Sequence, residues 1–133
     1  PVLLGPRLIR VISLSPSWNN AAPLHISLKT VCVVEFSSYE CLSYTWDGQV
    51  PDRSIYCGRK LMLVTANAEA AMRRLRRRHR PRCLWIDAVC INQACIKEKN
   101  AQVSMMADIY SNARTVLVWL GAGNEDSEKA ISY

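Results

Sequence analysis

Residues 81–93 read PRCLWIDAVCINQ, and the apolar run within them, 83–86, is the starting point for the fold. This run has aromatic and β-branched side chains, which favour strands, and it lacks alternating polar residues, as is typical of a strand buried on both faces. Pro81 and Asp87 bound it. We therefore predict a buried strand that ends just before Asp87.

Helical periodicity flanks this strand on both sides. Residues 66–80 predict a helix with Asn67 as its N-cap and Pro81 as its stop, and residues 97–112 predict a second helix. The apolar faces expected for the two helices are Ala68, Ala71, Met72 and Leu75 in the first, and Val103, Met106, Ala107, Tyr110 and Ala113 in the second.

Further strands are predicted over 40–46 and 115–120, with a last helix from Asn124. Nearer the N-terminus, residues 7–14 and 24–35 predict a β-hairpin, and a tight hairpin is predicted around Gly58 and Arg59.

The alternation of strands and helices over 40–133 calls for parallel pairing with right-handed crossovers. We therefore predict an α/β fold, with a mostly parallel sheet flanked by helices and an N-terminal β-hairpin. A chain of 133 residues can bury a core of its own, so we expect one domain over residues 1–133. The chain begins at Pro1 rather than Met and stops at Tyr133, within what the sequence predicts to be the opening of a helix, so we expect it to be a piece, taken as N-terminal, of a larger protein.

Positive charge is concentrated in one segment. Residues 73–82 hold seven of the 17 basic residues, so the rest of the chain is nearly neutral despite a net charge of +6. Such a run is typical either of a solvated helix end or of a surface that binds nucleic acid, anionic lipid or a nuclear import receptor. No aromatic residue is interleaved for base stacking, which disfavours nucleic acid.

The six cysteines lie mostly within or beside apolar strand-like runs, which favours free buried thiols over disulfides. The sequence contains no C-x-x-C pair, and neither histidine is spaced against a cysteine as zinc ligands are. No metal site is therefore predicted. No apolar stretch approaches the roughly 18 residues that a membrane-spanning helix needs, so no membrane span is predicted.

Four blocks of sequence form an ordered pattern that no general folding rule produces: 39–46 (YECLSYTW), 55–67, 84–93 (LWIDAVCINQ) and 98–121. Their motif residues are Ser43, Tyr44, Trp46, Trp85, Ile86, Asp87, Cys90, Asn92, Gln93, Glu98 and Gln102. In order and spacing these blocks resemble the heterokaryon incompatibility (HET) domain of filamentous fungi. The pattern departs from that family where Asp47 follows Trp46 and displaces the usual glycine to Gly48.

The resemblance implies a role in fungal non-self recognition and innate immunity, in which the domain triggers programmed cell death of incompatible cells. It implies regulated self-association, or association with other incompatibility or NLR-type proteins, in the cytoplasm or the nucleus. It also implies a distant likeness to TIR domains, which have a Rossmann-like α/β fold and of which some cleave NAD. A fold alone establishes no chemistry. We therefore expect no required cofactor and keep NAD as a candidate substrate.

Two residues are predicted to shape a substrate pocket. Ligands of open α/β sheets bind at the carboxyl ends of strands, where Asp87 and Trp46 would meet if their strands are parallel. An acidic and an aromatic side chain there can bind a ribose and a base ring. The alternative is that Asp87 caps the following turn while Trp46 and Trp85 belong to the core.

Glu98 is the predicted catalytic residue. Glu98 and Gln102 stand four apart and share one helix face, and a carboxylate in a first helical turn is kept ionised by the helix dipole. Such a carboxylate can stabilise the ribosyl cation that develops when the bond between nicotinamide and ribose breaks. The alternative is an ordinary first-turn glutamate. Cys90 is not a predicted nucleophile, because no histidine is placed to activate it.

Overall fold

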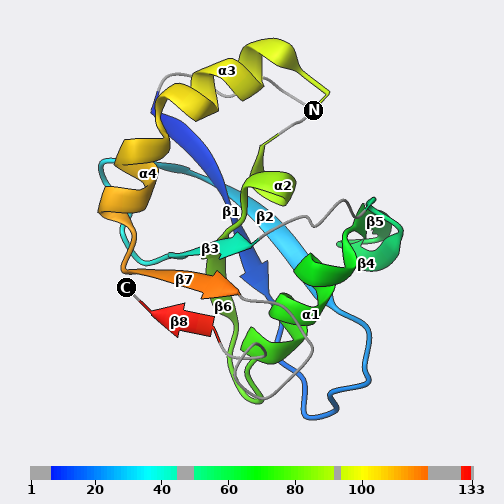
Figure 1. Ribbon diagram of the computed structural model, residues 1–133. Helices are drawn as coiled ribbons and strands as arrows, with labels where there is room; N and C mark the ends of the chain where they lie inside the picture. The colour runs from blue at the N-terminus through cyan, green and yellow to red at the C-terminus, as the bar shows by residue number, and fades with distance from the viewer. Residues whose placement is uncertain (1–6, 45–49, 92–93, 120–129, 133) are drawn as a thin grey trace.

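A mixed sheet of eight strands, in the order β5-β4-β2-β1-β6-β3-β7-β8, organises the computed structural model (Figure 1). The structure describes residues 7–44, 50–91, 94–119 and 130–132. The strands are β1 (Leu8–Leu14), β2 (His25–Cys32), β3 (Glu40–Tyr44), β4 (Arg53–Cys57), β5 (Lys60–Val64), β6 (Arg82–Trp85), β7 (Thr115–Trp119) and β8 (Ala130–Ser132). The helices are α1 (Ala66–Leu75), α2 (Asp87–Cys90), α3 (Ile96–Ser104) and α4 (Met106–Asn112).

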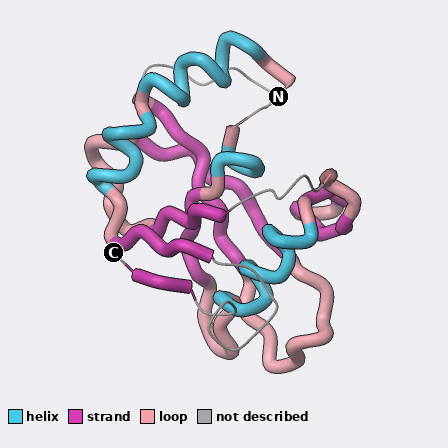
Figure 2. The backbone as a smooth tube through the Cα atoms, viewed as in Figure 1, coloured by secondary structure: helices cyan, strands magenta, loops and turns pink. Residues whose placement is uncertain are grey.

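The predicted mostly parallel sheet flanked by helices is wrong. Four of the strand pairs are antiparallel (β1–β2, β1–β6, β4–β5 and β7–β8) and three are parallel (β2–β4, β3–β6 and β3–β7). The prediction failed because it treated the N-terminal hairpin as an appendage, whereas β1 lies inside the sheet and pairs with both β2 and β6. Figure 2 shows the helices as short separate pieces rather than as covering layers.

The two hairpins that the sequence predicts are present. In the first, β1 pairs antiparallel with β2 along its whole length, from Leu8 opposite Cys32 to Leu14 opposite Ile26. In the second, β4 and β5 are joined by a two-residue turn, in which Gly58 has a φ of 62° that favours glycine. β5 forms one edge of the sheet.

Helix α1 buries the predicted face, because Ala68, Ala71, Met72 and Leu75 are all in the core. Its N-cap is Thr65 rather than Asn67, since the Thr65 hydroxyl accepts a hydrogen bond from the Ala68 N–H at 3.1 Å. The helix ends at Leu75 instead of continuing to 80. Continuation would stack arginines four apart within 73–80, and like charges at that spacing destabilise a helix.

The helix predicted over 97–112 is two helices, α3 and α4, which meet at Met105. The predicted apolar face is wrong for α3, because Val103 is 51% exposed while Glu98 and Gln102 are buried. The predicted C-terminal helix is also wrong where the structure describes it, since 130–132 form strand β8 beside β7. Residues 120–129, where that helix would begin, lie outside the described part.

The core is centred on β1 and β6, where Ile9, Ile12, Leu84 and Trp85 are fully buried. All six cysteines are free thiols. Among the described residues, no helix is both long enough and apolar enough to cross a membrane.

Candidate functional site

The carboxyl ends of β6, β3 and β7 meet at one edge of the sheet. β3 pairs in parallel with both neighbours, with Cys41 opposite Trp85 and Tyr44 opposite Trp119. The predicted pocket requires that β3 and β6 run parallel, and they do. Asp87 follows the end of β6, as predicted. Trp46, Asn92 and Gln93 lie outside the described residues, so the pocket of Trp46 and Asp87 stays a prediction.

Side chains from three elements gather near Asp87. The ring of Trp85 meets that of Tyr110 edge to face, with centroids 5.9 Å apart. Burial raises the pKa of Tyr110; nearby Cys41 and Asp87 add to this, and a hydrogen bond with Ser43 opposes it. Sequence reasoning placed Tyr110 in a helix face that packs on the core and did not single it out as part of this edge.

Glu98 is almost fully buried and lies against β1. Its two carboxylate oxygens accept hydrogen bonds from the Arg10 guanidinium at 2.7 and 2.9 Å. Arg10 also donates to the carbonyl of Cys90 at 3.3 Å. The hydrogen bond with Glu98 is the main cause that raises the pKa of Arg10, against the opposing effect of burial. Arg10 is therefore charged, and its contacts with Glu98 and Cys90 join β1, α2 and α3.

Gln102 extends this contact by one helical turn. Its side-chain amide donates to the carbonyl of Leu8 at 3.0 Å, and the side chain is only 1% exposed. Glu98 and Gln102 share one helix face, as predicted, and that face is the buried one. The polar face of α3 is thus fastened to the first strand of the sheet.

Arg10 is the residue that sequence reasoning missed. A charged side chain inside the apolar strand LIRVISL is the signal that could have found it, because a charge placed there needs a partner. Nothing local indicates that the partner comes from 88 residues further along the chain. The catalytic role of Glu98 stays a prediction.

Cys90 serves the packing of α2. Its thiol is fully buried, and its sulfur accepts a hydrogen bond from the Ile86 N–H at 3.4 Å. Burial is the main cause that raises the pKa of Cys90 to about 12. A thiol with that pKa is protonated at neutral pH and is a poor nucleophile.

Arg82 and Glu40 form a second ion pair, at the amino ends of β6 and β3. The Arg82 Nε lies 2.7 Å from a Glu40 oxygen. Another Arg82 nitrogen donates to the carbonyl of Leu75 at the end of α1. One arginine of the basic run is thereby committed to the fold.

Comparison with known proteins gives two matches. The family model described as "Heterokaryon incompatibility protein (HET)" matches residues 39–133. "Heterokaryon incompatibility protein 6, OR allele" of Neurospora crassa is 32% identical over 136 residues, which cover 92% of this chain and 20% of that protein. The chain therefore spans about a fifth of the curated relative's length. No solved structure matches the chain.

Proposed function

Because the chain belongs to the heterokaryon incompatibility (HET) family, we propose that it acts in fungal non-self recognition, as a module that triggers cell death when its copies associate. The observation that carries this proposal is the family match over residues 39–133. That span includes β3 to β8 and the buried residues Trp85, Glu98 and Gln102.

The exposed edge of the sheet supports self-association. β5 is an edge strand, and its Leu61 and Leu63 are 63% and 57% exposed. Tyr56, opposite Leu61 on β4, is also exposed and stacks on His25 at a centroid distance of 4.9 Å. An edge strand with exposed apolar side chains is a template for pairing with another strand. We assign this edge to a second copy of the same chain.

Charge substitutions on β5 test the proposal. Lysine on an edge strand opposes strand addition, so we expect the Leu61→Lys/Leu63→Lys double variant of the full-length parent to lose its toxicity in a fungal host. Val103→Lys is the control, because Val103 is also an exposed apolar residue, at 51%, but lies on α3. Growth is the readout, with protein levels compared by immunoblot.

Light scattering on the purified chain measures association directly. The wild type and the Val103→Lys control should form dimers or larger species at high concentration, and the β5 variant should stay monomeric. Equal growth arrest by all three proteins at equal expression contradicts the role of β5. Absence of growth arrest by the wild-type parent in an activating host contradicts the cell-death function itself.

A further inference from the structure

Four arginines of the basic run gather around one cavity. The cavity has a volume of about 480 Å³ and lies between α1, the loop that follows β1 and the end of β7. Its lining includes Arg73, Arg74, Arg76 and Arg78, together with Asn20 and Trp119. No carboxylate is among the described residues that line it. The cavity is thus concave and carries a positive charge.

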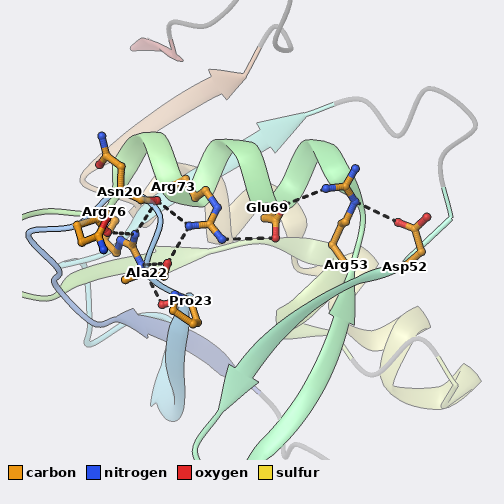
Figure 3. A network of polar contacts seen from close by, with 9 residues as sticks. Asn20, Ala22, Pro23, Asp52, Arg53, Glu69, Arg73 and Arg76 are labelled. Carbon is orange, nitrogen blue, oxygen red and sulfur yellow. Dashed lines mark hydrogen bonds and ion pairs between the residues drawn. The ribbon is translucent and has the colours of Figure 1, made fainter.

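Two of these arginines are held in place by the loop over the end of α1 (Figure 3). Arg73 donates to the carbonyls of Asn20 and Ala22, each at 2.8 Å. Arg76 donates to four carbonyls of residues 19–23, at 2.9 to 3.2 Å. Burial, and then the charge of Arg73, lower the pKa of Arg76. The positive charges are therefore crowded and fixed before any ligand arrives.

Among the described residues, the carboxylates nearest to these arginines stop short of the cavity. Figure 3 shows Asp52, Arg53, Glu69 and Arg73 in a row along α1, with Glu69 between the two arginines. The distances from Glu69 are 3.4 Å to Arg53 and 3.7 Å to Arg73. One carboxylate is thus shared by two guanidinium groups, and the arginines nearer the cavity keep an excess of positive charge.

Arg74 and Arg78 complete the lining and hold nothing in place. Both are exposed, and neither forms a hydrogen bond or an ion pair within the described part of the chain. Their guanidinium groups can therefore turn to a ligand without breaking a contact that the fold needs.

Trp119 supplies an unsatisfied donor. Its side chain is 3% exposed, and its indole N–H has no hydrogen-bond partner among the described residues. A buried donor without a partner costs about 1–3 kcal/mol. The arginine forks that line the cavity favour oxygen-rich anions.

We propose that this cavity binds a small ligand that carries two or more linked phosphate groups. Its volume lies within the range of roughly 300–1,000 Å³ that is typical of small-molecule sites. Arginine binds phosphate through paired N–H donors, and Arg74 and Arg78 can offer two such pairs beside the fixed positive charges of Arg73 and Arg76. Placement around a cavity, rather than along an open stripe, favours a small ligand over nucleic acid. This inference does not depend on the proposed self-association.

Titration calorimetry with ADP and with tripolyphosphate tests the proposal on the whole chain at low salt. We expect saturable binding with one ligand per chain. Because the guanidinium groups of Arg74 and Arg78 make no hydrogen bond or ion pair among the described residues, the Arg74→Gln/Arg78→Gln variant should melt at the wild-type temperature. It should bind either ligand about tenfold or more weakly, as the loss of one charge-assisted hydrogen bond or more implies.

Arg80→Gln is the matched control, because Arg80 belongs to the same run and does not line the cavity. Its affinity should stay within about twofold of the wild type, since one exposed charge at a distance is screened. No saturable binding, or an equal loss in Arg80→Gln, overturns the proposal. The chain could also bind random duplex DNA more tightly than either small ligand, with all three arginine changes reducing that binding alike. This result would overturn the proposal and assign the basic run to nucleic-acid binding.

Discussion

Arg10 and Glu98 form a buried ion pair in which each side chain removes the cost of burying the other. Their side chains are 14% and 2% exposed, and 88 positions separate them in the chain. A charge at this depth is stable only with a hydrogen-bonded partner. The pair therefore acts as a fastener between β1 and α3, whatever chemistry the site performs.

Changing Glu98→Gln keeps the shape of the side chain and removes the negative charge beside Arg10. We expect the free energy of unfolding to fall by about 3 kcal/mol, since breaking one side of a buried pair costs that much. Arg10→Gln should cost a similar amount. The double variant should lose less than the sum, because the two groups are coupled. Urea unfolding of the four proteins measures this, and strictly additive losses would contradict the coupling.

The same Glu98→Gln variant tests the predicted cleavage of NAD. A catalytic carboxylate predicts that the assembled wild-type domain releases nicotinamide, followed by chromatography, and that Glu98→Gln does not. Gln102→Ala is the control, because it loosens the same helix face and leaves the carboxylate in place. If both variants lose nicotinamide release equally, Glu98 has a structural role only. If the assembled wild type releases no nicotinamide, the NAD-cleavage hypothesis is wrong.

Cys90 predicts a dependence of stability on alkaline pH. Burial raises its pKa from 9.0 to about 12. In the unfolded chain the thiol ionises near its ordinary pKa, so the unfolded state loses the proton first as the pH rises. The stabilising effect is complete below about pH 9 and is lost between about 9 and 12, at about 1.4 kcal/mol per pH unit. Unfolding of wild type and Cys90→Ala across this range should give the shallower slope for the variant, and equal slopes would count against it.

At the scale of elements, α3 shows why periodicity alone misassigned a helix face. The sequence pattern puts Val103 inside and the polar residues outside, but the helix buries Glu98 and Gln102. Sequence periodicity treats every charged residue as solvent-facing, and it cannot see that β1 offers Arg10 and a free carbonyl at Leu8. By contrast the four apolar residues predicted to face the core from α1 are all buried, and only the burial of Asn67, predicted as the N-cap, was missed.

Substitutions on α3 should follow the observed face. Val103→Glu should change the free energy of unfolding by no more than about 0.5 kcal/mol, because its side chain is half exposed. Gln102→Ala should cost about 1–2 kcal/mol, because the Leu8 carbonyl would lose its donor. Thermal and urea unfolding of both variants compare the two faces. A larger loss of unfolding free energy in Val103→Glu than in Gln102→Ala would instead support the apolar face that the sequence predicts.

At the scale of the whole molecule, local patterns predicted most strands and both hairpins, while strand pairing remained out of reach. Alternation marks β1 as a strand, yet its second partner, β6, lies about 70 residues later, and no local signal records it. The error at 130–132 has the same origin, because Asn124 and the acidic residues after it resemble a helix start and β7 is the neighbour that makes a strand. The candidate site shows the same difference between local and long-range features. The position of Asp87 after β6 was predicted, and the pairing of Glu98 with Arg10 was not.

The central place of β1 also sets an order of events during synthesis. β1 leaves the ribosome before β6, and one side of β1 then remains unpaired until residues 82–85 follow. At roughly 5–20 residues per second, that wait lasts about 4–14 s. During this time, the apolar strand β1 exposes one edge of unpaired hydrogen-bonding groups to other nascent chains. Translation speed between β1 and β6 therefore sets how long the growing chain stays open to mispairing.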